Sequence, residues 1–340
     1  MPIARNLLVL AGLAALLAVQ SLMPATRGAA ELPHSGAPTP DTPVAAIAVF
    51  AASPEPGVAE LAPKLPYDAK PLGLDPEFVI GTLSGRRLPP DATFFAAPRD
   101  VRPFVLNGHG DFHHLTYYVL RDFIEPLATP YTVVNFDAHD DARSLEADFD
   151  KPWSDGLDCG NWSRFALARL PHLERVVQPG RKLEYAELGH WLAREAIAAG
   201  RFDLYPARPM RLFFKGQPDL GRFDGVARRD LLAGGAWQLE PKVWASVDLT
   251  NRITTRDVYL TVDLDVVRPE DFDDIGWGSG AVARSEIIAS IQAIARSHRV
   301  LGADLTGFPP ASAKRYSYEK NFETYREVAA ALHAALEGSK

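Results

Sequence analysis

The sequence predicts an α/β fold in which helices cover both faces of a parallel sheet. Three observations indicate this fold. Short apolar runs alternate along the chain with longer segments of helical spacing. The runs are apolar throughout, as expected for parallel strands that are buried on both faces. Several of them end abruptly in acidic residues or histidines, and ligands bind such sheets beyond the carboxyl ends of the strands.

The first half of the domain supplies three expected strands and three expected helices. The strands are short apolar runs, of which the first ends in Gly and the second is β-branched; they span 102–108, 131–137 and 174–180. The helices span 113–127, 163–173 and 184–200. In the first helix, Leu115, Tyr118, Val119 and Phe123 share one face. Gly200 closes the third in the manner of a C-cap.

The second half continues the same alternation. Apolar runs predict strands over 210–214, 242–249, 257–267 and 299–305. Strongly periodic segments predict helices over 284–298 and 321–338, the second amphipathic and closing the chain. No internal repeat of fixed period interrupts this order.

Composition narrows the classes of function. The 340 residues carry a net charge of −7, which argues against a nucleic-acid surface, because such surfaces need a basic stripe. A single cysteine, Cys159, excludes an internal disulfide and a thiolate cluster for structural zinc. Any metal must therefore be held by His and by Asp or Glu, ligands that suit Mn, Zn, Fe or Mg.

The N-terminus has the pattern of an export signal. Arg5 precedes an apolar run from Leu7 to Val19, and small residues follow at 28–30. Residues 1–30 are therefore expected to be a signal peptide or an N-terminal anchor, with residues 5–25 as a marginal membrane tether. The protein is expected to be exported, to the periplasm or the extracellular space.

A proline- and alanine-rich stretch follows the export signal. Its proline density over residues 31–70 favours extended, solvated chain, so this stretch is expected to be a linker. The apolar piece at 44–52 could instead dock on the domain. Residues 71–340 are expected to form the α/β domain.

Three expected strands end in residues that bind metal ions in other proteins. In chain order these residues are His109, Asp111, His113, His114, Asp137, His139, Asp140, Asp141, Asp263 and Asp265. If the three strands are parallel neighbours, their ends meet at one edge of the sheet. Side chains alternate along an extended strand, so Asp137, His139 and Asp141 are expected to face one side, with Asp140 facing away.

Metal binding explains this crowding better than turn chemistry does. Four carboxylates in one pocket repel one another, and divalent cations remove that cost. Two dications balance four aspartates, and neutral imidazoles complete their coordination. The alternative is that each Asp only caps the helix or turn that follows it. Three such strand ends in one chain favour a metal site.

The segments "GDFHHLT", "DAHDD" and "TVDLD" resemble, in this order and with these gaps, the arginase and agmatinase group of ureohydrolases. The resemblance covers roughly residues 100 to 310. It implies a three-layer α/β/α domain with a central parallel sheet, as in arginases and deacetylases. It also implies two divalent metal ions, usually Mn2+, with Zn2+ or Fe2+ as alternatives.

The resemblance also implies a role for each ligand. Asp137 and Asp263 would bridge the two ions, His139 and Asp265 would complete one, and Asp141 the other. The upstream histidine corresponds best to His113, with His114 as the second choice. Asp140 occupies a variable position.

Two departures separate this chain from the guanidine-cleaving members of the group. Gly307, in "DLTGFPP", stands where those members carry a Glu that grips the guanidinium. Trp162 or Ser163, in "CGNWSRF", stands near the place of a proton-shuttling His. Asp141, His109 and His114 are therefore the candidate catalytic residues, the two histidines as substitutes for the shuttle.

The resulting expectation is a metal-dependent hydrolase of a non-peptide C–N bond in a small amide, amidine or guanidino-like substrate. Two alternatives stay open: a single-zinc deacetylase-like amidohydrolase and a non-catalytic metal-binding protein. The expected partner is a small-molecule substrate, not nucleic acid, and the sequence does not indicate an oligomeric state.

Overall fold

The computed structural model describes residues 46–52, 58, 61–94, 100–142, 156–182, 196, 199–209, 211–215, 226–245, 249–273, 280–309 and 316–338. The chain divides into two compact units, Met1–Val44 and Ala45–Lys340, and all described residues belong to the second. The expected signal peptide lies outside the described residues. No helix among those residues is long and apolar enough to cross a membrane.

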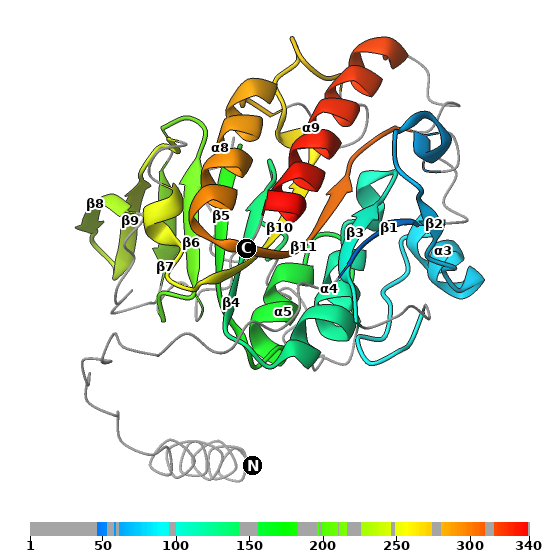
Figure 1. Ribbon diagram of the computed structural model, residues 1–340. Coiled ribbons are helices and arrows are strands. Elements are labelled where there is room, and N and C mark those ends of the chain that lie inside the picture. Colours follow the sequence, from blue (N-terminus) through cyan, green and yellow to red (C-terminus); the bar gives the residue numbers. More distant parts are fainter. Residues whose placement is uncertain are drawn as a thin grey trace, which may run out of the picture. The chain divides into compact units, whose positions relative to one another are not determined.

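The core of the second unit is an eight-stranded sheet in which all paired strands run parallel (Figure 1). Its strands, in spatial order, are β2 (Lys70–Pro71), β1 (Ile47–Ala51), β3 (Arg102–Leu106), β11 (Arg299–Thr306), β10 (Asp257–Asp263), β4 (Tyr131–Phe136), β5 (Leu173–Arg181) and β6 (Phe202–Pro206). The expected α/β fold with a central parallel sheet is confirmed. The strands at the centre are fully buried along their length.

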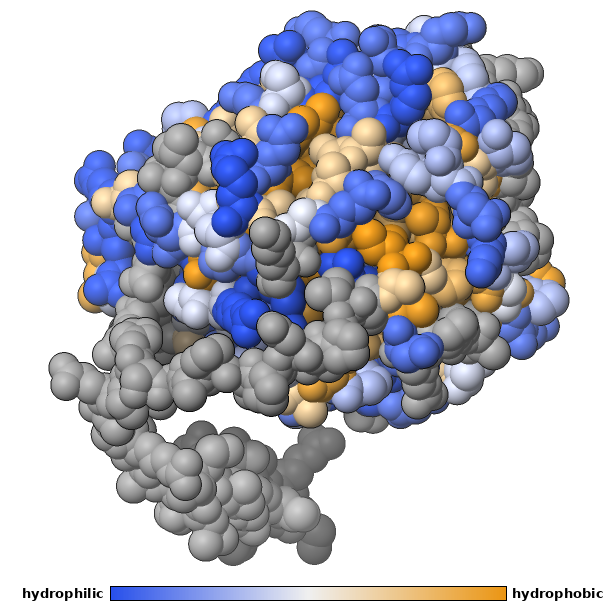
Figure 2. Space-filling model, in the orientation of Figure 1, coloured by the Kyte–Doolittle hydropathy of each residue, from blue (hydrophilic) through white to orange (hydrophobic). Residues whose placement is uncertain are grey.

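Two apolar cores, one on each face, make the domain three-layered. Adjacent strand residues alternate between them: Val133 belongs to one core and Val134 to the other. The first core lies under α3 (Pro76–Leu83), α4 (Leu115–Val119) and α5 (Trp162–Arg169), and the second under α8 (Arg284–Ser297) and α9 (Tyr318–Gly338). Figure 1 shows α8 and α9 side by side in front of the sheet, and Figure 2 shows the same face, on which hydrophilic residues border apolar patches.

Short helical turns complete the domain. Among the described residues, five are 3-10 helices: η1 (Ala62–Lys64), η2 (Gly110–Phe112), η4 (Glu125–Leu127), η7 (Thr250–Arg252) and η8 (Leu264–Val266). The sixth, η3 (Leu120–Ile124), is π-helical. The helix expected over 113–127 is therefore three successive helical types, α4, η3 and η4. Two of the 3-10 turns shape the site described below: η8 directly follows β10, and η2 lies shortly after β3.

A second sheet of three antiparallel strands differs from the expectation. Its order is β7 (Leu212–Lys215), β9 (Ala236–Pro241) and β8 (Val226–Leu231). Only β7 was expected from the sequence. The strand expected over 242–249 is wrong for its described part, because residues 242–245 are not in a strand. Val243 is 43% exposed, so this run lacks the buried face that a strand needs.

The N-terminal boundary of the domain also needs correction. β1 lies inside the stretch expected to be a linker, yet it pairs with β3 over five residues. Its last three residues, Val49 to Ala51, are buried, so apolar side chains outweigh the local proline content. The apolar piece therefore belongs to the sheet. Most of the helix expected over 184–200 lies outside the described residues.

Candidate metal centre

Strands β3, β10 and β4 bring the candidate ligands to one edge of the sheet. β10 pairs with β4 from Asp257 opposite Tyr131 to Val262 opposite Phe136, so Asp263 and Asp137 follow the two strands side by side. β11 lies on the other side of β10, and β3 lies next to β11. The turn η2 follows β3 and carries His113 as its C-cap residue. The expected convergence of the strand ends is what the structure shows.

The local reason for the convergence differs from the expected alternation. β4 ends at Phe136 and β10 at Asp263, so residues 137–141 and 264–265 are turns and not strands. Asp137 Oδ1 accepts a hydrogen bond from the His139 backbone N at 2.6 Å, and Asp263 Oδ1 accepts one from Asp265 N at 3.1 Å. These acids therefore shape their own turns as well as facing the site.

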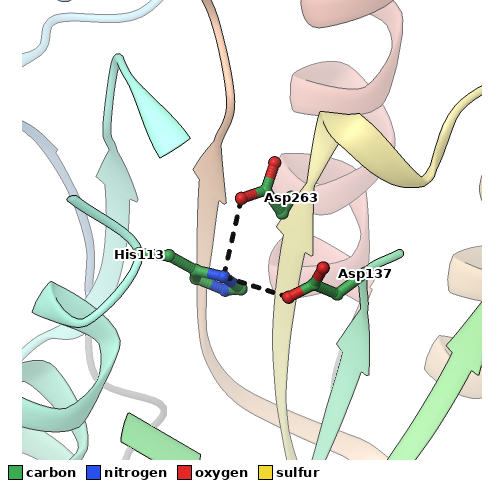
Figure 3. Close-up of side chains that lie close together, drawn as sticks. All are labelled: His113, Asp137 and Asp263. Carbon is green, nitrogen blue, oxygen red and sulfur yellow. Dashed lines mark ion pairs between the residues drawn. The ribbon is translucent and has the colours of Figure 1, made fainter. Parts of the chain in front are cut away.

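The first cluster is centred on His113, whose side chain is 1% exposed. Its Nδ1 lies 2.8 Å from Asp141 Oδ2, 3.3 Å from Asp137 Oδ2 and 3.6 Å from Asp263 Oδ2. Figure 3 shows the imidazole pointing between Asp137 and Asp263. Three carboxylates thus surround one buried ring nitrogen.

A buried hydrogen-bond chain orients the His113 ring from behind. Its Nε2 lies 2.9 Å from Thr261 Oγ1, and that hydroxyl donates to Asp304 Oδ1 at 2.7 Å. Because the Thr261 proton is used on Asp304, Nε2 must be the donor, so the neutral form of the ring carries its lone pair on Nδ1. Asp304 Oδ2 also accepts from Thr116 and Tyr259 at 3.0 and 2.8 Å. In its neutral form the ring thus offers Nδ1 as a metal ligand on the side where the carboxylates lie.

The second cluster joins His139 to Asp265. Its Nδ1 lies 2.7 Å from Asp265 Oδ2 and 3.7 Å from Asp137 Oδ1, and its side chain is 43% exposed. Asp265 Oδ1 accepts from the Ala138 backbone N at 3.1 Å, which ties the turn after β10 to the turn after β4. His139 is therefore the candidate ligand with the most exposed side chain.

The electrostatics of the cluster show the cost of its crowding. Burial, followed by the charge of Asp137, raises the pKa values of Asp141 and Asp265 to about 7. Burial, followed by the charges of Asp265 and Asp137, holds the pKa of Asp263 well above its usual range. Burial also opposes ionisation of Asp137, but the neighbouring imidazoles of His113 and His139 hold its pKa well below the usual range. Not all four carboxylates can ionise unless positive charge is added.

These residues fit a pair of divalent cations. Two groups of ligand atoms lie within 4.8 Å of one another, His113–Asp137–Asp263 and Asp137–His139–Asp265, and they share Asp137. Buried His113 Nδ1 has no hydrogen-bond partner among the described residues, as expected of a nitrogen that binds a metal ion. The donor set of imidazole and carboxylate suits Mn, Zn or Fe. Asp141 lies outside both groups but borders the first through His113.

The other expected catalytic residues lie away from the ligand atoms. His109 caps η2 by accepting from Asp111 N at 3.3 Å, and its Nδ1 lies 3.1 Å from Asp111 Oδ2. His114 is buried and stacks on Phe78 with ring centroids 5.1 Å apart. Burial lowers the pKa of His114 to about 4. The structure thus places His113, and not His114, against the carboxylates, and it gives His109 a place in a turn.

A cavity of about 650 Å³ opens onto the cluster. The expected ligands line it together with Asp111, Asp140, Asp158, Cys159 and Arg181. The end of α3 and the segment before α5 form the remaining walls. Sequence reasoning missed Arg181, Thr261, Asp304 and the bonding of Trp162, although an acid inside the apolar run "LGADL" was a signal for Asp304.

No protein-family model matches the sequence. An uncharacterised protein of Thermotoga maritima is 27% identical over 202 residues, which cover 59% of this chain and 56% of that protein. This chain thus spans little more than half of that relative.

Three solved structures illustrate the structural neighbours. The proclavaminate amidino hydrolase of Streptomyces clavuligerus is 18% identical, with a TM-score of 0.46 over 70% of this chain and 65% of that one. The arginase of Bacillus subtilis is 18% identical, with a TM-score of 0.45 over 71% of each chain. A hypothetical agmatinase of Burkholderia thailandensis is 19% identical, with a TM-score of 0.43 over 70% of this chain and 59% of that one.

Proposed function

We propose that this chain is a metal-dependent hydrolase that cleaves a non-peptide C–N bond of a small molecule and uses two divalent cations of the manganese type. The observation that carries the proposal is the position of His113 Nδ1, which faces three carboxylates at 2.8 to 3.6 Å in a buried pocket. A second His–Asp pair lies beside it and shares Asp137. Both clusters border the same cavity.

The chemistry follows from how the residues divide the work. When bound, two divalent cations activate a water molecule and polarise the bond to be cleaved. Asp137 lies between the two histidines and fixes the spacing of the two ligand groups. The open side of His139 leaves access for a substrate from the cavity. The Asp141 carboxylate borders the cavity, so it can accept the proton of the attacking water and return it to the leaving nitrogen.

A second candidate function has one observation in its favour. The group Asp137–His139–Asp265 is complete by itself, and a single zinc in the deacetylase-like amidohydrolases is held by the same residue types. The two candidates differ in metal stoichiometry. Two ions per chain support the proposed function, and one zinc per chain supports the alternative.

The test combines metal content with activity. The protein is stripped of metal with a chelator, reloaded with divalent metal ions and analysed for bound Mn, Zn and Fe. It is then assayed against amides, ureido compounds and guanidino compounds. We expect two ions per chain and hydrolysis that Asp137→Asn abolishes. Asp257→Asn is the matched control, because Asp257 lies on β10 at the opposite end from Asp263 and pairs with Arg299 at 2.5 Å. A chain that binds no divalent cation at micromolar concentration contradicts the proposal.

A further inference from the structure

Gly307 stands where the family that this chain resembles carries a guanidinium-binding Glu, and the structure leaves no room there for a side chain. Gly307 has a φ of +100°, a left-handed conformation that side chains rarely adopt. A Cβ added there would lie 2.4 Å from Asp263 Oδ1 and 2.7 Å from Leu264 N. Any side chain at this position would displace a candidate metal ligand. The cavity therefore cannot receive a carboxylate from Gly307.

A positively charged side chain, that of Arg181, lines the same cavity. Arg181 is the last residue of β5, is 5% exposed, and forms an ion pair with buried Asp140. Asp140 is itself held in place, since its Oδ1 accepts from Ala142 N at 3.2 Å. The Nε of Arg181 makes no hydrogen bond to any residue that the structure describes. A buried donor without an acceptor is unfavourable, and a bound molecule could supply the acceptor.

The other charged side chains around the cavity do not cancel the positive charge of Arg181. Asp111 faces His109 at 3.1 Å, and Asp158 faces Arg87 at 3.5 Å. Two divalent cations would balance the four ligand carboxylates. What remains next to the centre is the guanidinium of Arg181 with its open N–H.

We propose that Arg181 donates a hydrogen bond to a substrate oxygen beside the metal centre, so that the site takes amides or ureido compounds in preference to amidines and guanidines. This inference rests on the proposed function. Amidines and guanidines are protonated near neutral pH and present N–H donors, which would meet both the charge and the donor of Arg181. A carbonyl oxygen accepts a hydrogen bond and carries no positive charge.

Acetamide and acetamidine are suitable probes, because they have the same shape and differ only in carrying an oxygen or a charged nitrogen. With Mn2+ loaded into the protein, the paramagnetic ion broadens the methyl proton signal of a probe that binds nearby. The broadening as a function of probe concentration gives the affinity of each probe. Wild-type protein is expected to bind acetamide at least about tenfold more tightly than acetamidine, the effect of one charged hydrogen bond.

The variant Arg181→Met combined with Asp140→Asn removes both charges, so that no buried carboxylate is left unpaired. It is expected to lose the preference for acetamide while it still binds Mn2+ and keeps the wild-type circular dichroism. The matched control is Arg175→Met, because Arg175 lies on the same strand and pairs with Asp203 at 2.8 Å away from the cavity. It is expected to keep the preference.

The outcomes separate the two proposals. If Mn2+ binds but wild-type protein prefers acetamidine, or the double variant keeps the preference for acetamide, the role of Arg181 is overturned and the metal centre stands. If Mn2+ does not bind to wild-type protein, the proposed function fails and the role of Arg181 fails with it.

Discussion

The indole Nε1 of Trp162 donates a hydrogen bond to Asp141 Oδ2 at 2.6 Å, across 21 residues of sequence. Both residues are buried, and Asp141 has a φ of 47°, which is uncommon for a residue with a side chain. Ser163, next in the chain, donates from its backbone N and its Oγ to the Asp141 carbonyl at 3.0 and 2.8 Å. The start of α5 thus holds Asp141 in a strained conformation that aims its carboxylate at His113.

Replacing Trp162 by Phe removes this hydrogen bond and keeps an aromatic ring. We expect Trp162→Phe to weaken binding of one of the two cations about 10–100-fold, as loss of a partner behind a metal ligand does, and to leave the other cation unaffected. Calorimetric titration with Mn2+ measures both steps. Trp244→Phe is the control, because the Trp244 indole N–H has no hydrogen-bond partner among the described residues. Equal affinities in Trp162→Phe and wild type would show that Trp162 has no such role.

Thr261 connects His113 to Asp304, so its hydroxyl should matter for metal binding as well as for stability. Thr261→Val keeps the shape but leaves His113 Nε2 and Asp304 Oδ1 without this partner. We expect the free energy of unfolding to fall by about 1–3 kcal/mol and metal affinity to fall about 10–100-fold. Urea denaturation and Mn2+ titration measure the two effects.

Thr255→Val is the matched control for Thr261. Thr255 is also buried, but it donates to the Asp257 carbonyl at 2.7 Å near the opposite end of β10. Stability should fall there too, whereas metal affinity should not change. A loss of metal affinity of the same size in both variants would mean that the effect comes from general destabilisation.

Gly307 and Gly73 offer a paired test of the close approach to Asp263. Both have positive φ, of +100° and +69°, but a Cβ at Gly73 would meet nothing within 4 Å. Gly73→Ala is expected to cost about 1–2 kcal/mol from backbone conformation alone. Gly307→Ala should cost more and also reduce Mn2+ binding, because the new methyl group displaces Asp263. Thermal unfolding and metal titration of the two variants decide this; similar results for both would refute the close approach.

The metal-free protein should lose stability as pH rises from about 5 to 7.5. The pKa values of Asp141 and Asp265 are raised to about 7 by burial and by Asp137, so the folded state binds more protons than the unfolded chain between pH 4 and 7. The pKa of His139, raised to about 12 by Asp265 and Asp137 against the effect of burial, acts in the same direction above pH 6.5. The lowered pKa of Asp137 adds a contribution that is constant above about pH 4.

Added Mn2+ should reverse this trend. Protons compete with cations for the same carboxylates and imidazoles, so the stabilisation by metal should grow as pH rises toward 7. Urea denaturation at pH 5 and pH 7.5, with EDTA and with Mn2+, gives the four values needed. Greater stability of the EDTA-treated protein at pH 7.5 than at pH 5 would argue against the assigned directions.

The sequence predicts the convergence of the strand ends well, because the fold alone decides it. The carboxyl ends of parallel strands meet at one edge, so the convergence of Asp137 and Asp263 follows once their runs are recognised as neighbouring strands. The alternation expected within 137–141 does not hold, since these residues form a turn and Asp141 has a positive φ. The types of the ligand residues could be predicted from the sequence, but the orientation of their side chains could not.

The supporting residues could not be found because they depend on contacts that are distant in sequence. Asp304 reaches Thr116 across 188 positions, and Arg181 meets Asp140 only through the packing of β5 beside β4. In the same way, the sequence kept His114 as the second choice beside His113. Stacking on Phe78 and a hydrogen bond between its Nε2 and Thr82 Oγ1 at 3.2 Å hold its ring against α3 instead, at the wall of the cavity.

The central claim is that two divalent cations share the Asp137 carboxylate between His113 and His139. Anomalous X-ray scattering at the manganese edge, from crystals of the Mn2+-loaded protein, tests it most directly. The account predicts two peaks about 3.5–4 Å apart, one beside His113 Nδ1 and one beside His139 Nδ1. A single peak, or none among these side chains, would contradict it.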